Sequence, residues 1–469
     1  MSFLESLAVF LPAILTGFLI VQLLWDNGSP VALLLKVCIG TGVGLGVTSL
    51  LYFLYLLIFA GGEFFLYLQL AVLLFLLAIV LKRGNFRFAF PNLRPGLSAW
   101  QVAVACLVLP VIGLAVLGAV SVWTHRPFGT WDAFMIYDRT ARFVYRGQSE
   151  WLQTFSPDID PAFHADYPLL IPLNIAQAWQ TLGRESQSVP RTLGGIFMLV
   201  CAGTLVSGLT LLKSIWQGLA GLLVLLNTPF FILSGPSQTA DVPLTFFILS
   251  SVILIFLYTS TQRRGLLVLA GLSAGLAAWT KNEGDVFVIG ILLGLLLAFV
   301  KNGPWRRLGY FAVGLATPLV IIIGFKVFLA PANDILGTNA AGLIRRIFEW
   351  PRHLAILGSY RTQILAIGGT AVSVILILGI YALVFGVEHN KQRNPAFIAA
   401  LVAACVQAIG YYGIYLITPH PILWQLDFSL WRVLFHIYLP LLFVFFVFVT
   451  DIPKALGFQP RPIQSEGIA

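Results

Sequence analysis

Apolar runs of about 20 residues, separated by short polar connections, follow one another along almost the whole chain. A helix needs roughly 20 mostly apolar residues to cross a bilayer, so the sequence predicts about thirteen spans. Two of them are Leu219–Leu233 and Thr362–Phe385. Charged residues make up only 10% of the 469 residues, whereas roughly a quarter is usual in soluble proteins. A water-soluble globule is therefore excluded, and we expect an all-α polytopic membrane protein.

The polar connections divide into basic and acidic groups. The segment Lys82–Arg94 is strongly basic, so the positive-inside rule places it in the cytoplasm. When the spans alternate from there, four of the 19 carboxylates fall inside, which leaves fifteen outside. Asp and Glu contribute little to the positive-inside rule, so this asymmetry predicts a functional site on the extracytoplasmic face. The same rule accounts for the net charge of +9, and no nucleic-acid partner is expected.

Two extracytoplasmic connections, residues 124–191 and 331–361, are long enough to fold. Each carries an amphipathic pattern that is typical of helices lying in the membrane interface, and the second pattern is interrupted at Pro351. We expect a single membrane domain over residues 1–469 with a small extracytoplasmic cap of interfacial helices. The first apolar run lacks the basic start of a cleaved signal peptide, so it is expected to remain as a span.

The first of these loops opens with Asp132, which follows the fourth apolar run closely and is expected at the membrane–water boundary. Apolar residues then recur at three- and four-residue steps, which predicts an amphipathic helix that starts at Ala133. These residues are Phe134, Tyr137, Ala141, Val144 and Tyr145. The arginines between them are candidates for contacts with lipid phosphates, or for a solvated face alone. Asp132 is a candidate either for catalysis or for capping this helix, because Asp is a favoured N-cap.

Four polar residues crowd together later in the same loop. They are Asp158, Asp160, His164 and Asp166. Carboxylates and imidazoles can bind a divalent cation, although this spacing matches no closed metal motif. The alternative is that they hydrogen-bond a polar substrate or cap the helix that follows. The apolar segment after Tyr167 is too short to span comfortably, so it is expected to re-enter or skim the membrane.

Four segments of the chain resemble, in order, the GT-C superfamily of membrane glycosyltransferases. They are TWDAFMIYDRTARFVY, HADYPLLIPL, SGPSQTADVPLTFF and AAWTKNEG. The likeness is greatest to bacterial members akin to protein mannosyltransferases and lipid A aminoarabinose transferases. It implies a GT-C fold in a bacterial plasma membrane, with a polyprenyl-phosphate sugar as donor and a glycan, lipid or protein as acceptor. It also implies catalysis on the outer face by an acidic residue of the first loop, and that residue matches Asp132.

The resemblance and the chemistry together suggest a role for each candidate residue. Asp132 and Asp166 are the catalytic candidates, with Asp132 as the general base of an inverting transfer. Cations must stabilise the charge that grows on the departing phosphate. Arg432 and Lys281 are the candidates for this task, or are only anchors at span ends. The other substrate-binding candidates are His164, Tyr167, Asp241 and Glu283.

Three alternatives stay open for these residues. Asp241 could cap a helix instead of lining the site, and Glu283 could pair with Lys281 instead of orienting a sugar hydroxyl. No cofactor is required by the sequence, and a divalent cation is possible. The competing function is a membrane transporter or lipid flippase. Transporters bury ionisable groups at mid-membrane, whereas here only Lys36, Lys326 and His436 lie well inside spans, which favours the enzyme.

Overall fold

The computed structural model describes residues 3–84, 99–302, 305–333, 340–369, 373–388 and 390–455. Apart from one isolated bridge between Val387 and Val449, these residues contain no β-structure. Most of the basic segment Lys82–Arg94 lies outside the described residues, and so do residues 334–339 of the second loop and the tail after residue 455.

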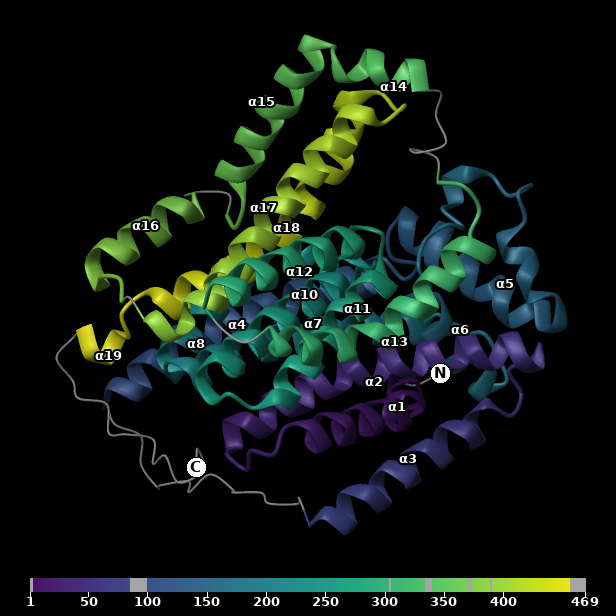
Figure 1. Ribbon diagram of the computed structural model, residues 1–469, viewed down its shortest axis with the longest axis horizontal. Helices are drawn as coiled ribbons and strands as arrows, with labels where there is room; N and C mark the ends of the chain where they lie inside the picture. Colours follow the sequence, from purple (N-terminus) through teal and green to yellow (C-terminus); the bar gives the residue numbers. More distant parts are fainter. Residues whose placement is uncertain are drawn as a thin grey trace.

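The described residues form α-helices with a few short 3₁₀ and π segments (Figure 1). The elements are α1 (Phe3–Leu24), α2 (Pro30–Phe59), α3 (Phe65–Arg83), α4 (Ala99–His125), η1 (Ala133–Asp138), α5 (Arg139–Gly147), η2 (Gln148–Phe155), η3 (Pro161–Phe163), α6 (Leu170–Leu182), α7 (Ser188–Leu212), α8 (Ile215–Leu226), α9 (Pro229–Ser234), η4 (Gly235–Ser237), α10 (Asp241–Thr261), α11 (Arg264–Thr280), α12 (Glu283–Asn302), α13 (Arg306–Phe328), α14 (Ala340–Ile347), α15 (Trp350–Ala366), α16 (Val374–Phe385), η5 (Lys391–Arg393), α17 (Asn394–Ile417), α18 (Ile422–Phe448) and α19 (Ile452–Ala455).

The expected all-α polytopic membrane fold is confirmed. Within the described ranges, nine helices are long and apolar enough to cross a membrane, or ten if one bent pair counts as a span. The bent pair is α8 with α9 and η4, which meet at 72°. It replaces the single straight span expected over Leu219–Leu233, because Pro229 lacks the N–H that would continue the helix and instead begins a new one.

The span expected over Thr362–Phe385 is wrong. Helix α15 already ends at Ala366, and α16 starts only at Val374. Gly368 lies in the break with a φ of 81°, a left-handed conformation that glycine adopts without strain. In the second outer loop the expected break next to Pro351 is present, because α14 ends at Ile347 and α15 begins at Trp350, whereas the interfacial placement of these helices stays a prediction. Pro351 stands in the first turn of α15, where its missing N–H costs nothing, and Figure 1 shows α14 and α15 projecting away from the bundle.

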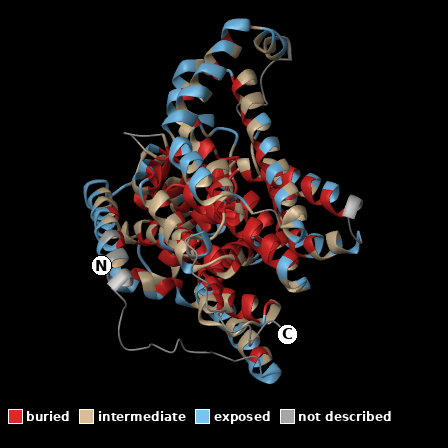
Figure 2. Cartoon of the chain, turned by 90° about the vertical axis from the view of Figure 1, so that its left-hand side faces the viewer, coloured by how far each residue is buried: buried red, intermediate tan, exposed pale blue. Residues whose placement is uncertain are grey.

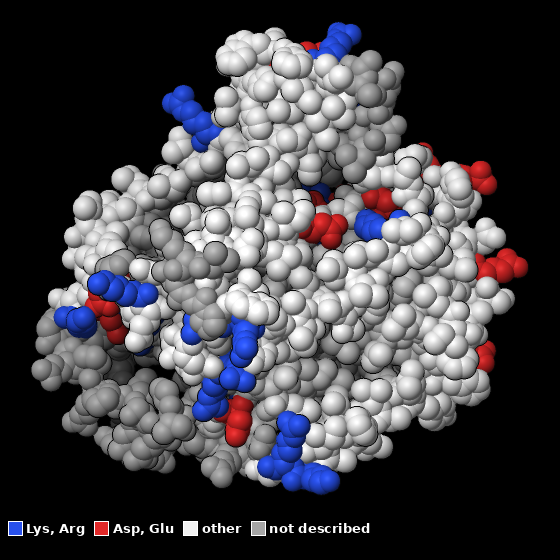
Figure 3. Space-filling model, viewed as in Figure 1, with Lys and Arg blue, Asp and Glu red and all other residues white. Residues whose placement is uncertain are grey.

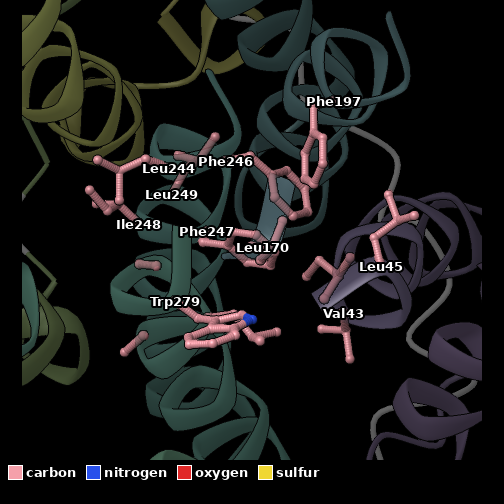
Figure 4. Packing of buried hydrophobic residues seen from close by; sticks show 14 of the residues in the cluster. Val43, Leu45, Leu170, Phe197, Leu244, Phe246, Phe247, Ile248, Leu249 and Trp279 are labelled. Carbon is pink, nitrogen blue, oxygen red and sulfur yellow. The ribbon is translucent and has the colours of Figure 1, made fainter. Parts of the chain in front are cut away.

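Helix α10 lies at the centre of the bundle, and every residue from Asp241 to Thr259 is buried. Its sequence is apolar on all sides, as expected for a helix that is surrounded by others. Figure 4 shows Phe246 and Phe247 of α10 beside Phe197 of α7, and Trp279 at the end of α11. In Figure 2 the buried residues fill the middle of the molecule. This core fixes the start of α10 and the end of α11, from which the candidate site is built.

The segment after Tyr167 forms the short helix α6, and its expected re-entry into the membrane stays a prediction. All residues from Leu170 to Trp179 are buried, and α6 packs between α2 and α5. The Asn174 side chain donates hydrogen bonds to the carbonyl oxygens of Leu45 at 3.1 Å and Leu170 at 2.8 Å. Helix α6 therefore lies inside the protein, where it packs against α5 of the first loop.

Candidate functional site

The first loop begins with a π-helical turn, η1, that continues into α5. Of the predicted stripe, Tyr137, Ala141 and Val144 are buried and Tyr145 is half-buried, but Phe134 is 40% exposed. The buried face packs against α6, and the expected position of the helix in the membrane interface stays a prediction. A capping role for Asp132 is contradicted, because its side chain makes no hydrogen bond to the start of η1.

The arginines of α5 find a protein partner. Arg142 Nε lies 3.5 Å from Glu185 Oε2, and Arg146 Nη2 donates to the same oxygen at 2.9 Å. Arg139 Nε donates to the carbonyl oxygen of Met135 at 3.1 Å. The two contacts with Glu185 link α5 to the segment that precedes α7, and because the Arg146 side chain keeps 66% of its exposure, contacts of these arginines with lipid phosphates stay a prediction.

Asp132 reaches across the fold to Arg432 in the first half of α18. Arg432 Nη2 donates to Asp132 Oδ2 at 2.6 Å and to Asp241 Oδ2 at 2.8 Å, and its Nε donates to Asp241 Oδ2 at 3.0 Å. Asp241 is the first residue of α10, and its carboxylate does not cap that helix. The side chains of Asp132 and Arg432 keep only 10% and 11% of their exposure, so this ion pair is largely withdrawn from solvent.

Lys281 joins the same cluster from the turn between α11 and α12. Its Nζ donates to Asp241 Oδ1 at 3.0 Å and lies 2.8 Å from Glu283 Oε1. Burial alone would lower the pKa of Lys281, but the attraction of the Asp241 and Glu283 carboxylates is larger than this effect, so the pKa of Lys281 is raised. The pairing of Glu283 with Lys281, which the sequence left open, is therefore present. Asp241 holds both cations, one on each carboxylate oxygen.

The packing around the turn explains why Lys281 is held so firmly. Trp279 is fully buried, and its Nε1 donates to Ser49 Oγ at 2.9 Å. A Cβ on Gly284 would collide with the carbonyl oxygen of Ala277, so only glycine allows the turn to pack this closely on α11. The residues on either side of Lys281 thus fix its position.

Asp166 lies in an adjacent polar group that is joined to the first by the same turn. Its Oδ2 accepts hydrogen bonds from Asn282 Nδ2 at 2.9 Å and Asn333 Nδ2 at 2.8 Å. Lys326 Nζ donates to Asn282 Oδ1 at 2.6 Å and to the Asp166 carbonyl oxygen at 2.5 Å. Asn282 stands between Lys281 and Glu283 in the sequence, so the two groups share one rigid segment.

His164 and Tyr167 flank Asp166. Their rings stack with centroids 4.6 Å apart, and His164 Nδ1 lies 3.9 Å from Asp166 Oδ1. Burial, with Glu283 nearby, raises the pKa of Tyr167 well above its ordinary value, so its phenol stays protonated. All eight candidate residues therefore lie in two adjoining groups, whereas their roles remain predictions.

The other two acidic residues of the predicted cluster lie elsewhere. Asp158 and Asp160 are exposed, and Asp160 Oδ1 accepts a hydrogen bond from the Ala162 N–H at 2.9 Å, where it caps η3. Within the part of the chain that the structure describes, no three His, Cys, Asp or Glu side chains are arranged to hold a metal ion. The predicted Asp/His cluster is thus divided between a helix cap and the site.

Several polar residues of the site were not selected from the sequence. His436 Nε2 lies 3.4 Å from Asp241 Oδ1, and Tyr137 is buried beside Asp132. Among the described atoms, four buried polar atoms of the site residues named so far have no hydrogen-bond partner: Tyr137 Oη, His164 Nδ1, Glu283 Oε2 and His436 Nε2. Native proteins leave few such atoms, and they cluster where a ligand supplies the partner. His436 had a usable signal, since it lies one helical turn after Arg432 and inside a span.

The surface near the site carries charges of both signs. Figure 3 shows acidic and basic side chains together in a hollow below the arm formed by α14 and α15. Most of the surface around this hollow is uncharged in the same view.

Asp138 is a buried acid at the end of η1, and its burial gives a prediction about pH. Its Oδ2 accepts a hydrogen bond from Gln187 Nε2 at 2.8 Å, whereas Oδ1 has no partner among the described atoms. Burial raises the pKa of Asp138 to about 6 from its ordinary 3.8. The folded state binds the Asp138 proton more tightly than the unfolded state does. Protonation of Asp138 therefore contributes fully to the free energy of unfolding below pH 3.8, and this contribution is lost as the pH rises through 6.

Asp138→Asn removes this titration. We expect the variant to be more stable than the wild type at pH 7.5 by about 2–3 kcal/mol, with the difference vanishing near pH 4. Thermal unfolding of purified protein in detergent at several pH values measures it. Asp158→Asn, an exposed carboxylate in the same loop, is the control and should show no such pH-dependent difference. Equal curves for Asp138→Asn and the wild type would contradict the prediction.

Comparison with known families agrees with the resemblance seen in the sequence. Residues 166–327 match the sequence model of the family described as dolichyl-phosphate-mannose-protein mannosyltransferase. The matched part is about a third of the chain and includes Asp166, Asp241, Lys281 and Glu283. It supports the resemblance to the GT-C superfamily and indicates a glycosyltransferase. Neither the curated proteins nor the solved structures gave a match.

Proposed function

We propose that this protein transfers a sugar from a polyprenyl-phosphate donor to an acceptor hydroxyl at the extracytoplasmic face of a bacterial plasma membrane. The observation that carries the proposal is the convergence of Asp132, Asp241, Lys281, Glu283 and Arg432 from four distant segments into one charged cluster. Such a cluster is costly to bury, so it is a strong candidate for function. The family match supplies the class of donor.

The reaction assigns a task to each part of the cluster. The acceptor hydroxyl oxygen attacks the anomeric carbon of the donor, and Asp132 takes the hydroxyl proton. The bond from the anomeric carbon to the phosphate oxygen breaks, and its electron pair leaves with the polyprenyl phosphate. Lys281 and Arg432 stabilise the charge that grows on that phosphate. Attack opposite to the leaving group inverts the configuration at the anomeric carbon.

The second polar group suits recognition of the sugar or the acceptor. Asp166 presents a carboxylate that is fixed by two amides, and the His164–Tyr167 stack offers a flat aromatic surface beside it. Hydroxyl groups need acceptors and donors of this kind at fixed positions, and a sugar ring can lie against an aromatic face. We assign His164, Asp166 and Tyr167 to this binding task, with Lys326 and Asn282 as residues that position Asp166.

The direct test is a transfer assay with purified protein and a radiolabelled polyprenyl-phosphate sugar. The proposal expects release of polyprenyl phosphate that depends on the protein and on an added acceptor fraction from the cell envelope. Inversion is read from the anomeric configuration of the product. If labelled sugar is moved across vesicle membranes intact and no phosphate ester is cleaved, the protein is a transporter or flippase, and the proposal fails.

Sidedness gives a separate prediction. Ser149 in the first loop and Gln262 after α10 are both exposed, and they are expected on opposite sides of the membrane. The exposed Cys106 and Cys405 are first replaced by Ser to remove background. An impermeant thiol reagent added to intact cells should label Ser149→Cys and leave Gln262→Cys unlabelled until the membrane is opened. The reverse pattern would place the site in the cytoplasm.

A further inference from the structure

The guanidinium of Arg432 is shared by two carboxylates, and the way they share it has a consequence for substrate binding. A guanidinium can offer an anion two adjacent donors along either of two edges, Nε with one Nη, or the two Nη atoms. Asp241 Oδ2 occupies the first edge, since it accepts from Nε at 3.0 Å and from Nη2 at 2.8 Å. Only the second edge is left for a further bidentate partner.

Asp132 occupies half of that second edge. Its Oδ2 accepts from the same Nη2 at 2.6 Å, the shortest of the three contacts. An Nη atom carries two hydrogens, so Asp132 and Asp241 together use both hydrogens of Nη2. A phosphate that binds Arg432 through two donors therefore needs the hydrogen that Asp132 now holds.

A phosphate could displace Asp132 from Arg432 much more easily than it could displace Asp241. Asp241 is fully buried, and its other oxygen is held by Lys281 at 3.0 Å, with His436 3.4 Å away. The side chain of Asp132 keeps a tenth of its exposure, and within the described part of the chain its hydrogen bond is with Arg432. An arriving phosphate would thus displace Asp132 and leave the Asp241–Arg432 pair intact.

Resting on the proposed function, we infer that the donor phosphate and Asp132 compete for one Nη2 hydrogen of Arg432, so that donor binding releases the base. Before the donor binds, Asp132 Oδ2 accepts a hydrogen bond from the guanidinium and is occupied. After exchange, the phosphate lies between Arg432 and Lys281, and Asp132 is free to take the acceptor proton. The donor therefore binds before the acceptor can be activated.

The competition predicts an unusual effect of removing a catalytic candidate. If Arg432 is free of Asp132 in only about a tenth of the molecules, the apparent Kd for a polyprenyl phosphate is raised about tenfold. Asp132→Asn and Asp132→Ala weaken or remove the competitor, so both should bind polyprenyl phosphate up to about tenfold more tightly than the wild type. A group that merely helped to bind the donor would give the opposite sign.

The experiment measures binding of a fluorescent polyprenyl phosphate to the purified, detergent-solubilised full-length protein. Asp158→Asn is the matched control in the same loop, and it should bind as the wild type does. The uncharged polyprenol is the matched probe, and its affinity should be equal in all variants because it does not need Arg432. A Kd for both Asp132 variants that equals or exceeds the wild-type Kd overturns the inference.

The same variants separate this inference from the proposed function. Loss of transfer together with tighter binding supports both. Loss of transfer with unchanged binding overturns the exchange but leaves Asp132 as the base. Retained transfer in Asp132→Asn overturns the base assignment, and the inference with it. Equal wild-type affinity for polyprenyl phosphate and polyprenol would overturn the donor class itself.

Discussion

Asp132→Asn is expected to lower kcat for sugar transfer by about 10³-fold, the usual range for loss of a positioned general base. The amide has nearly the same shape as the carboxylate and can still accept the hydrogen bond from Arg432, but it cannot take a proton. The fold should survive, because Asp132 does not cap η1 and its side chain forms its hydrogen bond with Arg432, which the amide can keep. Initial rates with a labelled polyprenyl-phosphate donor, together with the melting temperature of the variant, measure the effect.

The control for this variant is Asp158→Asn, which changes an exposed carboxylate of the same loop. It should transfer sugar at the wild-type rate. Normal kcat in Asp132→Asn, with the control also normal, would remove Asp132 from the mechanism. A parallel loss of kcat and melting temperature would instead indicate a structural role.

Arg432→Gln should have the second large effect, on both activity and stability. The variant leaves Asp132 and the fully buried Asp241 without their shared guanidinium. Breaking a buried ion pair by removing one partner costs about 3–5 kcal/mol. Loss of a charged hydrogen-bond donor to the departing phosphate should also lower kcat/KM by about 10²–10³-fold. Transfer rates at several donor concentrations and thermal unfolding in detergent measure the two effects separately.

Two further variants serve as controls for Arg432→Gln. Arg432→Lys keeps the charge but cannot bridge two carboxylates with a planar fork, so its activity should lie between the wild type and Arg432→Gln. Arg146→Gln changes an arginine of the same cap whose side chain is 66% exposed, and it should leave transfer and stability nearly unchanged. Wild-type kcat/KM in a folded Arg432→Gln would contradict the role given to this residue.

The apolar runs were sufficient to predict the fold class, because a chain this rich in apolar residues has few alternatives to a helical bundle in a bilayer. Helix breaks were harder to predict. The run Thr362–Phe385 carries no charge and is mostly apolar, yet α15 ends at Ala366 and Gly368 adopts a left-handed conformation, a break that mean hydropathy does not record. The burial of α6 was also not predicted, since the composition of an apolar helix of 13 residues does not say whether protein surrounds it.

The candidate site was predictable as a set of residues but not as a network. The predicted topology placed Asp132, Asp241, Lys281 and Arg432 at helix ends on the same side of the membrane. Helix ends on one side lie near one another, so these residues were expected together. The pairing within the set depends on which helices are neighbours, and that was not visible in the sequence. Lys326 was noted only as a charge inside a span, although it holds Asp166 and Asn282 in place.

The central claim is that Lys281 and Arg432 bind the phosphate of a lipid-linked sugar beside Asp132. The most direct measurement is an electron cryo-microscopy structure of the full-length protein with polyprenyl phosphate bound. We expect the phosphate within hydrogen-bonding distance of Lys281 Nζ and the Nη atoms of Arg432, with the Asp132 carboxylate turned away from the guanidinium. A phosphate bound away from both cations, with the Asp132–Arg432 pair intact, would contradict the account.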